Sequence, residues 1–537
     1  MAPSAISTGN SPEGLRPITI NGDKIMSSLK MDNLTLSLSP NQTQTHTSTP
    51  SPSESLDLIC VGFGPASLAI AIALHDTYSK SSLAPPKVLF LEKQPEFAWH
   101  AGMQLPGARM QISFLKDLAT PRDPRSKFTF INYLHSKGRL NTFINLSTFL
   151  PSRMEYEDYL RWCASHFEKE GCVKYGANVE SVVPSSPSVE DGKIASFAIS
   201  FSSPSGEVVT HAARNVVIAV GGKAVIPPVL RNKPCVLHSS QFATSIGKIE
   251  KLQRESRKPL RFAVVGSGQS AAEIYNDLWE RFGEETGVTV KLIVKGQSLR
   301  PSDDSPLYVP LLHFPLHLPQ TTPKTNPPSV NEIFDPDRVT PHYNRPSHIR
   351  ASGLALDRAT NYGVVRLELL EHLYEKLYLQ RIKCERIGSP PRSAIITNRR
   401  VTSAIASPSN DSLRIKIVTE EGSEKEEEEI DVDYIFVATG YRRDAHVSIL
   451  RDCEDLATGE GAMVKGENGL EKGVWEVGRD YRVLMVEGRV RDRAGVWLQG
   501  CNESTHGLSD SLLSILAIRG GELVDSMFGE QLKVASA

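Results

Sequence analysis

The chain has 537 residues, a length that predicts two or three domains. It is 40% hydrophobic and 23% charged, and its net charge of −2 gives no reason to expect a nucleic acid or an anionic membrane as the main partner. It has no run of about 18 apolar residues and no C-x-x-C spacing among its seven cysteines, which argues against a transmembrane helix, a disulfide framework, a zinc knuckle and a redox dithiol.

Residues 1–55 are rich in Ser, Thr, Asn and Pro. Because such a segment cannot bury enough apolar surface to offset the entropy lost on ordering, we expect a disordered tail. The segment has neither the basic start and apolar core of a secretory signal nor the Arg-rich character of a transit peptide. Together with the scattered cysteines, this predicts a reducing, cytoplasmic location.

A strand–turn–helix unit begins at Leu56. The run LDLICVG predicts a buried strand, and FGPASLAIAIALHD predicts a helix whose small residues face a sheet. Between them, the turn from Gly62 through Gly64 to Ser67 lets the backbone approach a pyrophosphate at the helix N-terminus. A second strand, KVLFLEK, ends near Glu92, where a carboxylate can bind a ribose 2′-hydroxyl. The unit predicts a bound dinucleotide, and the alternative is an empty structural turn.

The pattern restarts after a helix expected over Glu155–Phe167 and a strand expected over Asn215–Gly222. RFAVVGSGQSAAEIYNDLWERF again predicts a strand, a glycine turn and a helix, and KLIVKG predicts the next strand. Here Lys295 stands where the ribose carboxylate would be, with Arg300 close behind. Because a cation suits a 2′-phosphate that a carboxylate would repel, the pattern favours NADPH over NADH. The alternative is that Lys295 is a solvated strand end.

Further elements follow in order. Pro301–Arg350 is rich in Pro and His and weakly periodic, Arg366–Ile382 predicts an amphipathic helix, and the acidic run Glu424–Glu429 predicts a solvated hairpin. Asp433–Tyr441 predicts a buried strand with a glycine exit, and Gly507–Phe528 predicts a closing helix. Such a glycine exit commonly returns the chain beneath a flavin, so we predict FAD in the first site and NADPH in the second. The expected fold class is α/β, with two Rossmann-like domains and a small substrate-binding region.

Two dinucleotide sites narrow the class of flavoprotein. A disulfide reductase needs a dithiol, which the sequence lacks, and an amine oxidase needs no second dinucleotide site. A monooxygenase needs both cofactors and no protein nucleophile, because the cofactor carries the chemistry. The protein must then position the substrate and exclude water.

Long segments resemble one family. These segments are Leu91–Leu134, VGSGQSAAEI, LRPSDDSP, VNEIFDP, ATNYGVVRLELLE, FVATGY and HGLSDSLLS. From about Leu56 to the last helix, the chain resembles the N-hydroxylating flavoprotein monooxygenases of siderophore biosynthesis, in particular the L-ornithine N(5)-monooxygenases. The resemblance implies hydroxylation of the ornithine side-chain amine by O2 to N(5)-hydroxy-L-ornithine, the first step towards hydroxamate iron chelators, in a homotetramer. The flavin hydroperoxide performs this chemistry, so no catalytic side chain and no metal site are expected.

The resemblance also implies which residues bind each ligand. The substrate would be held by Lys116 at its carboxylate and Asn331 at its α-amino group, with Glu332, Ile333, Phe334, Asn361 and Ser514. FAD would contact Gly62, Gly64, Ser67, Glu92, Lys93, Gln94, Pro95, Glu96, Phe97, Ala98, Trp99, His100, Met110, Gln111, Val179, Ser511, Leu512 and Leu513. NADPH would contact Gly266, Ser267, Gly268, Gln269, Ser270, Lys295, Asn361, Tyr362 and Gly363. For Lys116 alone, the residue type would indicate only an ordinary surface lysine.

The expected domain boundaries follow. Residues 56–235 and 431–537 would form the FAD-binding domain, 236–300 and 362–430 the NADPH-binding domain, and 301–361 the substrate region. The family runs DDSP directly into its VNEIF motif, whereas here residues 307–329 intervene. The insertion is either a tolerated surface loop or translated intron sequence.

Other functions stay open at this point. L-lysine or a diamine are alternative substrates, because a pocket discriminates one methylene by only ~1–3 kcal/mol. An alternative of a different class is a non-catalytic protein that binds FAD and NADPH.

Overall fold

The computed structural model describes residues 55–256, 258–283, 287–302, 333–408, 411–422, 425–458, 463–465, 471–473 and 475–536. All but the last residue of the tail expected over 1–55, and the whole insertion at 307–329, lie outside these residues. In the described part of the chain, no helix combines the length and the apolar character needed to cross a bilayer.

The first sheet has seven strands and is built around β1 (Leu56–Val61). β1 pairs in parallel with β2 (Val88–Glu92) on one side and with the second half of β6 (Val208–Ile218) on the other. Five of the six residues of β1 are buried because helices cover this part of the sheet. The remaining strands are β3 (Val173–Tyr175), β4 (Asn178–Pro184), β5 (Phe197–Ser202) and β21 (Gly495–Leu498).

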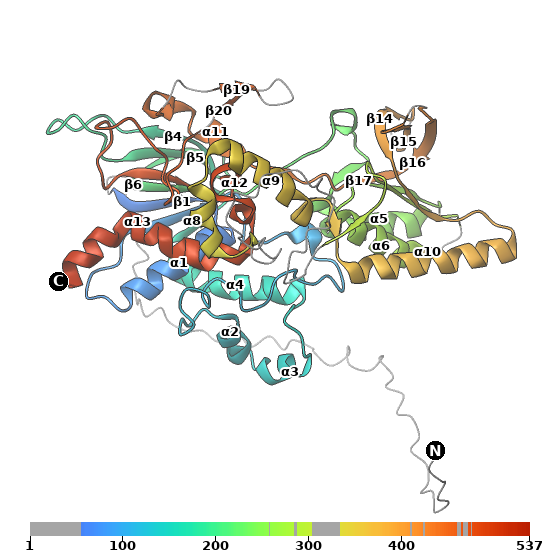
Figure 1. Ribbon diagram of the computed structural model, residues 1–537, viewed down its shortest axis with the longest axis horizontal. Helices are drawn as coiled ribbons and strands as arrows, with labels where there is room; N and C mark the ends of the chain where they lie inside the picture. The colour runs from blue at the N-terminus through green and yellow to red at the C-terminus, as the bar shows by residue number, and fades with distance from the viewer. Residues whose placement is uncertain are drawn as a thin grey trace, which may run out of the picture. The chain divides into compact units, whose positions relative to one another are not determined.

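Two helices pack together beside this sheet. α1 (Pro65–Tyr78) follows the first glycine turn, and the C-terminal α13 (Leu516–Ser536) crosses it, as Figure 1 shows. A β-carbon on Gly520 of α13 would lie 2.7 Å from the carbonyl oxygen of Ala69, so the helices approach at backbone distance. The closing helix begins at Leu516, so the expectation that it begins at Gly507 is wrong. Residues Leu508–Ser511 and Leu513–Ile515 form 3-10 turns before it.

The second sheet is wholly parallel, in the order β13-β10-β9-β17-β8. Its centre is β9 (Arg261–Val265), which leads through the second glycine turn into α6 (Gln269–Phe282). β17 (Tyr434–Val437) pairs with β9 and β8, so the strand of the FVATGY segment belongs to this sheet and not to the first, where residues from 431 onward are expected. The other strands are β8 (Val236–His238), β10 (Thr289–Ile293) and β13 (Ser393–Ile396).

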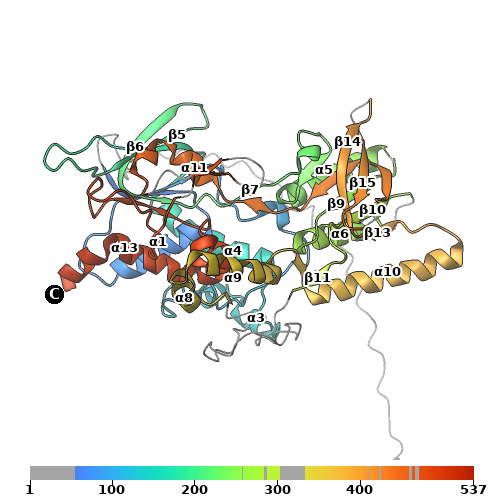
Figure 2. The same ribbon diagram turned by 45° about the horizontal axis from the view of Figure 1, so that its top comes forward.

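A three-stranded antiparallel sheet lies beside the second sheet, as Figure 2 shows. It consists of β14 (Arg399–Ala406), β15 (Leu413–Thr419) and β16 (Glu427–Val432). The acidic run falls on the β15–β16 hairpin, and Glu427, Glu428 and Glu429 are exposed there, in agreement with the sequence. The apolar face of β15 packs into the core under β9 and β17.

The remaining helices connect and flank the sheets. α10 (Leu367–Ile387) is the longest helix near the second sheet and contacts α6. It extends the helix expected over Arg366–Ile382, and Gly388 ends it in a left-handed conformation. The others are α2 (Phe130–Ser136), α3 (Leu140–Asn145), α4 (Arg153–Lys169), α5 (Phe242–Ser256), α8 (Val339–Tyr343), α9 (Ser347–Asn361), α11 (Ala445–Ile449) and α12 (Glu503–His506).

Candidate functional site

The first glycine turn is shaped by Gly62, whose φ is +92°. A β-carbon at Gly62 would lie 2.6 Å from the carbonyl oxygen of Ala219, so only glycine fits without backbone movement. Around a β-carbon built on Gly64, the cap of α1, no described atom lies within 4 Å. The start of α1 is therefore open to an anion such as a pyrophosphate.

Glu92 closes the first site at the end of β2. It is buried, and its carboxylate accepts hydrogen bonds from the Phe63 N–H at 2.8 Å and the Gln94 N–H at 2.9 Å. A carboxylate has about four acceptor positions, so Glu92 can also accept a ribose hydroxyl. Beyond it, Lys93, Gln94, Pro95, Glu96 and His100 are exposed, Phe97 is buried, and Ala98 and Trp99 are half-buried.

A segment from the far end of the chain carries Ser511, Leu512, Leu513 and Ser514. It is fixed by Asp510, which is buried, pairs with Arg519 at 2.9 Å and accepts the Asn502 N–H at 2.7 Å. Ser511 donates to Glu503 at 2.8 Å. The Ser514 hydroxyl is buried and has no hydrogen-bond partner among the described residues. A buried hydroxyl without a partner is costly, so this one fits a position that meets a ligand.

The second glycine turn repeats the geometry of the first. Gly266 has a φ of +152°, and a β-carbon there would lie 2.5 Å from the carbonyl oxygen of Ala438. A β-carbon on Gly268, which caps α6, would stand 3.6 Å from the Cα atom of Gly363. This close approach brings the segment 361–363 against the turn, although the two are far apart in sequence.

A cavity of about 630 Å³ opens at the second turn, a volume suited to a small-molecule or cofactor site. Its lining contains every residue that the resemblance implies for NADPH, together with Gln111 from the part of the chain expected to contact FAD. These residues are Gly266, Ser267, Gly268, Gln269, Ser270, Lys295, Asn361, Tyr362, Gly363 and Gln111. Lys116, Ser514, Ile333 and Phe334 do not line it.

The cavity wall also contains residues that the sequence does not identify. Arg358, Arg399, Arg400, Thr439 and Tyr441 lie on segments that meet only in the folded chain. Thr439 and Tyr441 flank the glycine exit of β17, a position that the FVATGY motif could have indicated. The two arginines at the start of β14 carry no such signal, because their strand is not evident from the pattern of apolar residues.

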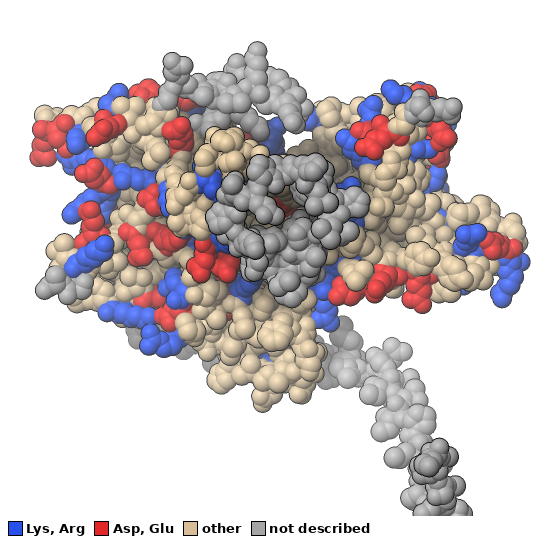
Figure 3. All heavy atoms as spheres, in the orientation of Figure 1, with Lys and Arg blue, Asp and Glu red and all other residues tan. Residues whose placement is uncertain are grey.

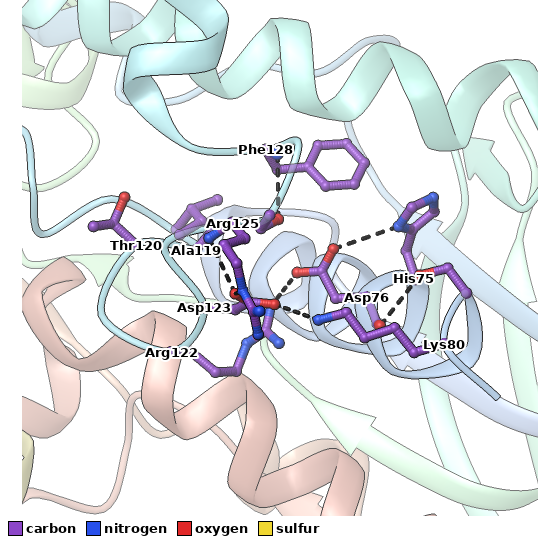
Figure 4. A network of polar contacts seen from close by, with 12 residues as sticks. His75, Asp76, Lys80, Ala119, Thr120, Arg122, Asp123, Arg125 and Phe128 are labelled. Carbon is purple, nitrogen blue, oxygen red and sulfur yellow. Dashed lines mark hydrogen bonds and ion pairs between the residues drawn. The ribbon is translucent and has the colours of Figure 1, made fainter.

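Lys116 lies on a loop that is held firmly at several points. The next residue, Asp117, is buried and accepts the N–H groups of Ala119 at 2.8 Å and Phe130 at 2.7 Å. Further along the loop, Arg122 pairs with Asp76 of α1 at 2.5 Å, and Asp123 pairs with Lys80, as Figure 4 shows. Lys116 is half-buried, and its ammonium has no ion-pair partner among the described residues, which suits it to an anionic ligand.

Polar contacts join α6, which follows the second glycine turn, to α4, and Arg366 to the segment of Met110. Arg153, at the start of α4, forms two 3.0 Å hydrogen bonds to Glu273 of α6 and donates to the carbonyl oxygen of Met103 at 2.6 Å. Gln269 donates to Glu273 at 3.0 Å and accepts the Arg366 N–H at 2.9 Å. Arg366 in turn donates to the carbonyl oxygen of the buried Met110 at 3.3 Å.

The other expected site residues are scattered. Ser67 is buried in α1, Val179 is half-buried in β4, and Ile333 and Phe334 are half-buried. Asn331 and Glu332 lie outside the described residues. Within the described ranges, no group of three His, Cys, Asp or Glu side chains could hold a metal ion. The two glycine cradles, the buried Glu92 and the basic cavity wall fit two dinucleotides, one at each turn.

Known proteins resemble the chain along most of its length. A family model described as L-lysine 6-monooxygenase/L-ornithine 5-monooxygenase matches residues 54–315 and 312–443. An L-ornithine N(5)-monooxygenase from Cochliobolus heterostrophus is 46% identical over 488 residues, which cover 86% of this chain and 84% of the relative.

Two solved structures share the fold. The ornithine hydroxylase PvdA from Pseudomonas aeruginosa matches with a TM-score of 0.73 and 32% identity, over 89% of this chain and 100% of the other. The ornithine N-hydroxylase KtzI from Kutzneria sp. 744, a structure named for reduced FAD, NADP+ and L-ornithine, matches with a TM-score of 0.71 and 33% identity over the same shares.

Proposed function

We propose a function from one premise: the chain belongs to the L-lysine 6-monooxygenase/L-ornithine 5-monooxygenase family. It is a flavin-dependent monooxygenase that hydroxylates the side-chain amine of L-ornithine, with FAD and NADPH as cofactors. The observation that carries this proposal is the single cavity that joins the second glycine turn to Gln111 and Asn361. The first of these two residues comes from the segment expected at the flavin, and the second from the segment expected at ornithine.

The residues of the chain bind and orient the reactants. When bound, FAD supplies the redox chemistry that transfers an oxygen atom to the amine. Among the residues that the structure describes, the Lys116 ammonium has no ion-pair partner and the buried Ser514 hydroxyl has no hydrogen-bond partner. The first can bind the α-carboxylate of ornithine, and the second can make a further contact. Asn331 is proposed to accept from the α-amino group, with Glu332, Ile333 and Phe334 beside it.

Holding the amino acid at one end leaves its side-chain amine at the other end to lose a proton. The free amine has a pKa of ~10.4, as in lysine, so most of it is charged and unreactive near neutral pH. A site that excludes water lowers that pKa because desolvation disfavours the charged form. The clamped loop at Lys116 provides the fixed end that this requires, since its hydrogen bonds run to both α1 and Phe130.

The decisive experiment uses the purified full-length chain. We expect the chain to carry FAD and to form hydroxylated ornithine, measured by mass spectrometry, in the presence of NADPH and O2. L-lysine and 1,4-diaminobutane serve as competing substrates. Flavin binding with no hydroxylated product from any of the three would refute the enzyme and support a non-catalytic binder. A preference for lysine or the diamine would correct the substrate.

Lys116→Ala tests the proposed substrate contact. Loss of a charge-assisted contact to the carboxylate is expected to raise the KM for ornithine by roughly 10–100-fold, while flavin content stays unchanged. Lys127→Ala, a lysine of the same region whose side chain lies over Phe128, is the control. An unchanged KM in Lys116→Ala would place the carboxylate elsewhere.

We also propose a homotetramer in the cytoplasm, on the family resemblance, and α10 supports a contact between copies. Exposed apolar side chains recur at Tyr374, Tyr378 and Ile382. Its first half carries Glu368, Glu371 and Glu375. Its second half carries Arg381, Lys383 and Arg386 with one carboxylate, Glu385, so it is basic on balance. In Figure 3, acidic side chains gather along the first part of the helix, and basic side chains lie with acidic ones at its far end. An antiparallel second copy would place each acidic half over a basic half.

Light scattering tests this contact. Tyr378→Glu is expected to lower the molar mass of the particle in solution, because it buries a charge in the contact. Ile405→Glu, on the exposed face of β14, is the control. An unchanged mass in Tyr378→Glu would remove α10 from the interface.

A further inference from the structure

The cavity at the second glycine turn has a cationic end that the glycine motif does not explain. Lys295 follows β10, and Arg399 and Arg400 begin β14, and all three line the cavity. Backbone hydrogen bonds hold the two segments together. The Arg399 N–H donates to the carbonyl oxygen of Val294 at 3.0 Å, and the Asn398 N–H donates to that of Gly296 at 2.8 Å.

A carboxylate outside the lining holds two of these cations. Glu420, just after β15, lies 3.0 Å from the Lys295 ammonium through one oxygen and 2.9 Å from the Nε atom of Arg400 through the other. Its backbone N–H donates to the carbonyl oxygen of Asn398 at 3.0 Å, which fixes its place. The Glu420 carboxylate therefore holds the charged ends of Lys295 and Arg400 close together.

The three cations differ in what they have left to offer. Arg399 is mostly buried and pairs with Glu426 at 2.5 Å. Arg400 is half exposed, its Nε atom lies 2.9 Å from a carboxylate oxygen of Glu420, and its two terminal nitrogens make no hydrogen bond to a described residue. Those two nitrogens form the planar fork that binds phosphate oxygens. Lys295 is three-quarters exposed and can turn towards the same oxygen atoms.

We propose that Arg400 is a second phosphate-binding cation beside Lys295, and that Glu420 is a positioning residue that holds both towards the 2′-phosphate of NADPH. This inference rests on the proposed use of NADPH, and it names residues for which neither the glycine motif nor the resemblance provides a role. In many sites for NADH a carboxylate accepts the ribose 2′-hydroxyl. Here two cations lie against the nearby carboxylate and offset its charge, so it does not repel a 2′-phosphate as an unpaired carboxylate would.

Equilibrium binding tests the proposal without relying on turnover. Calorimetry on the purified full-length chain, loaded with FAD, measures the dissociation constants of NADP+, NAD+, adenosine 2′,5′-bisphosphate and AMP. Arg400→Gln is expected to weaken NADP+ and the bisphosphate by about tenfold or more, because a charge-assisted hydrogen bond contributes about 1.5–3 kcal/mol. Binding of NAD+ and AMP is expected to stay within about twofold, since neither carries the 2′-phosphate.

Three variants complete the design. Arg400→Lys keeps the charge and is expected to lose less affinity for NADP+ than Arg400→Gln. Arg414→Gln removes an exposed arginine of β15 that pairs with Asp431, and it is the control that leaves all four ligands unaffected. Glu420→Gln is expected to leave NAD+ binding unchanged. Loss of NAD+ affinity in Glu420→Gln would instead show that Glu420 takes the ribose hydroxyl, and would overturn the proposal.

The outcomes separate this inference from the proposed function. If the wild-type chain does not bind NADP+, the assignment of NADPH fails, and with it this inference. If the wild-type chain binds NADP+ more tightly than NAD+ and Arg400→Gln keeps the same preference, only the role of Arg400 fails. Circular dichroism of each variant shows whether it is misfolded. Because Arg400→Lys keeps the positive charge, its affinity for NADP+ shows whether the loss in Arg400→Gln comes from the missing charge.

Discussion

Gly62 and Gly266 occupy the same place in the two strand–turn–helix units, and a β-carbon at either would meet a backbone carbonyl at 2.6 Å or 2.5 Å. Their surroundings differ. The first turn is backed by a buried carboxylate, and its helix α1 packs against α13 at backbone distance. The second turn faces an open cavity with a cationic wall. A cofactor site built into the core is coupled to the stability of its domain, whereas a site on a cavity can fill and empty without unfolding.

The largest effect is expected at Arg519, which belongs to the core around the first site. Arg519→Leu leaves Asp510 buried without a countercharge, and breaking such a pair costs about 3–5 kcal/mol. Burial already raises the pKa of Asp510, so the carboxyl is poorly placed to stay ionised alone. Denaturant unfolding and flavin content measure the loss.

The double variant Asp510→Asn with Arg519→Leu sharpens this prediction. Because it removes the uncompensated charge, we expect it to recover much of the stability that Arg519→Leu loses. Arg254→Leu, at an exposed position of α5, is the control. Equal stability of Arg519→Leu and the wild-type chain would contradict a coupling between the first site and the core.

The two glycines give the most direct test of the comparison. Gly62→Ala combines a positive φ with a collision against the Ala219 carbonyl, so we expect about 3 kcal/mol of destabilisation and loss of FAD. Gly266→Ala meets a similar collision at Ala438, but we expect it to abolish NADP+ binding while flavin content stays near normal. If both variants lose FAD equally, the two sites are not independent.

Much of this arrangement is predictable from the sequence because a glycine turn is a local structure. The apolar strand, the glycines and the helix that follow one another in LDLICVGFGP and RFAVVGSGQS predict α1 and α6 nearly to their bounds. Lys295 is predictable for the same reason, since it closely follows the next strand.

What the sequence does not predict depends on contacts between distant segments. The closing helix begins at Leu516 because Gly507 has a φ of +89° and Asp510 turns inward to Arg519. Arg400 reaches the cavity only through the backbone bonds between the start of β14 and the end of β10. Neither contact has a signature in the pattern of apolar residues.

A smaller effect is expected where the two regions meet. Glu273→Gln weakens both hydrogen bonds from Arg153 and leaves the guanidinium mostly buried without its countercharge, at an expected cost of about 2 kcal/mol. Because Glu273 also accepts from Gln269, we expect weaker NADP+ binding together with faster hydrogen exchange in α4. Glu280→Gln, an exposed carboxylate of the same helix, is the control. If only NADP+ binding changes, or only hydrogen exchange in α4, the Arg153–Glu273 pair does not couple the two regions.

The smallest effect distinguishes the two regions by the sign of their response to acid. Asp76 of α1 is buried, which by itself raises its pKa, but the nearby His75 ring and the hydrogen bond from Arg122 outweigh burial and hold the pKa below its usual value. In α6, burial raises the pKa of Asp277, and Arg281 offsets this only in part.

A carboxyl with a lowered pKa stabilises the fold above its unfolded pKa of ~3.9 and loses that contribution as the pH falls through the folded pKa. One with a raised pKa gains relative stability on acidification through the same window. Between pH 7 and pH 3 at constant ionic strength, the opening free energy that hydrogen exchange measures, after correction for the intrinsic exchange rate at each pH, should therefore fall more in α1 than in α6, by about 1 kcal/mol. Asp76→Asn should remove the difference in α1, and a pH response that Asp76→Asn leaves unchanged would assign the acid sensitivity to another group.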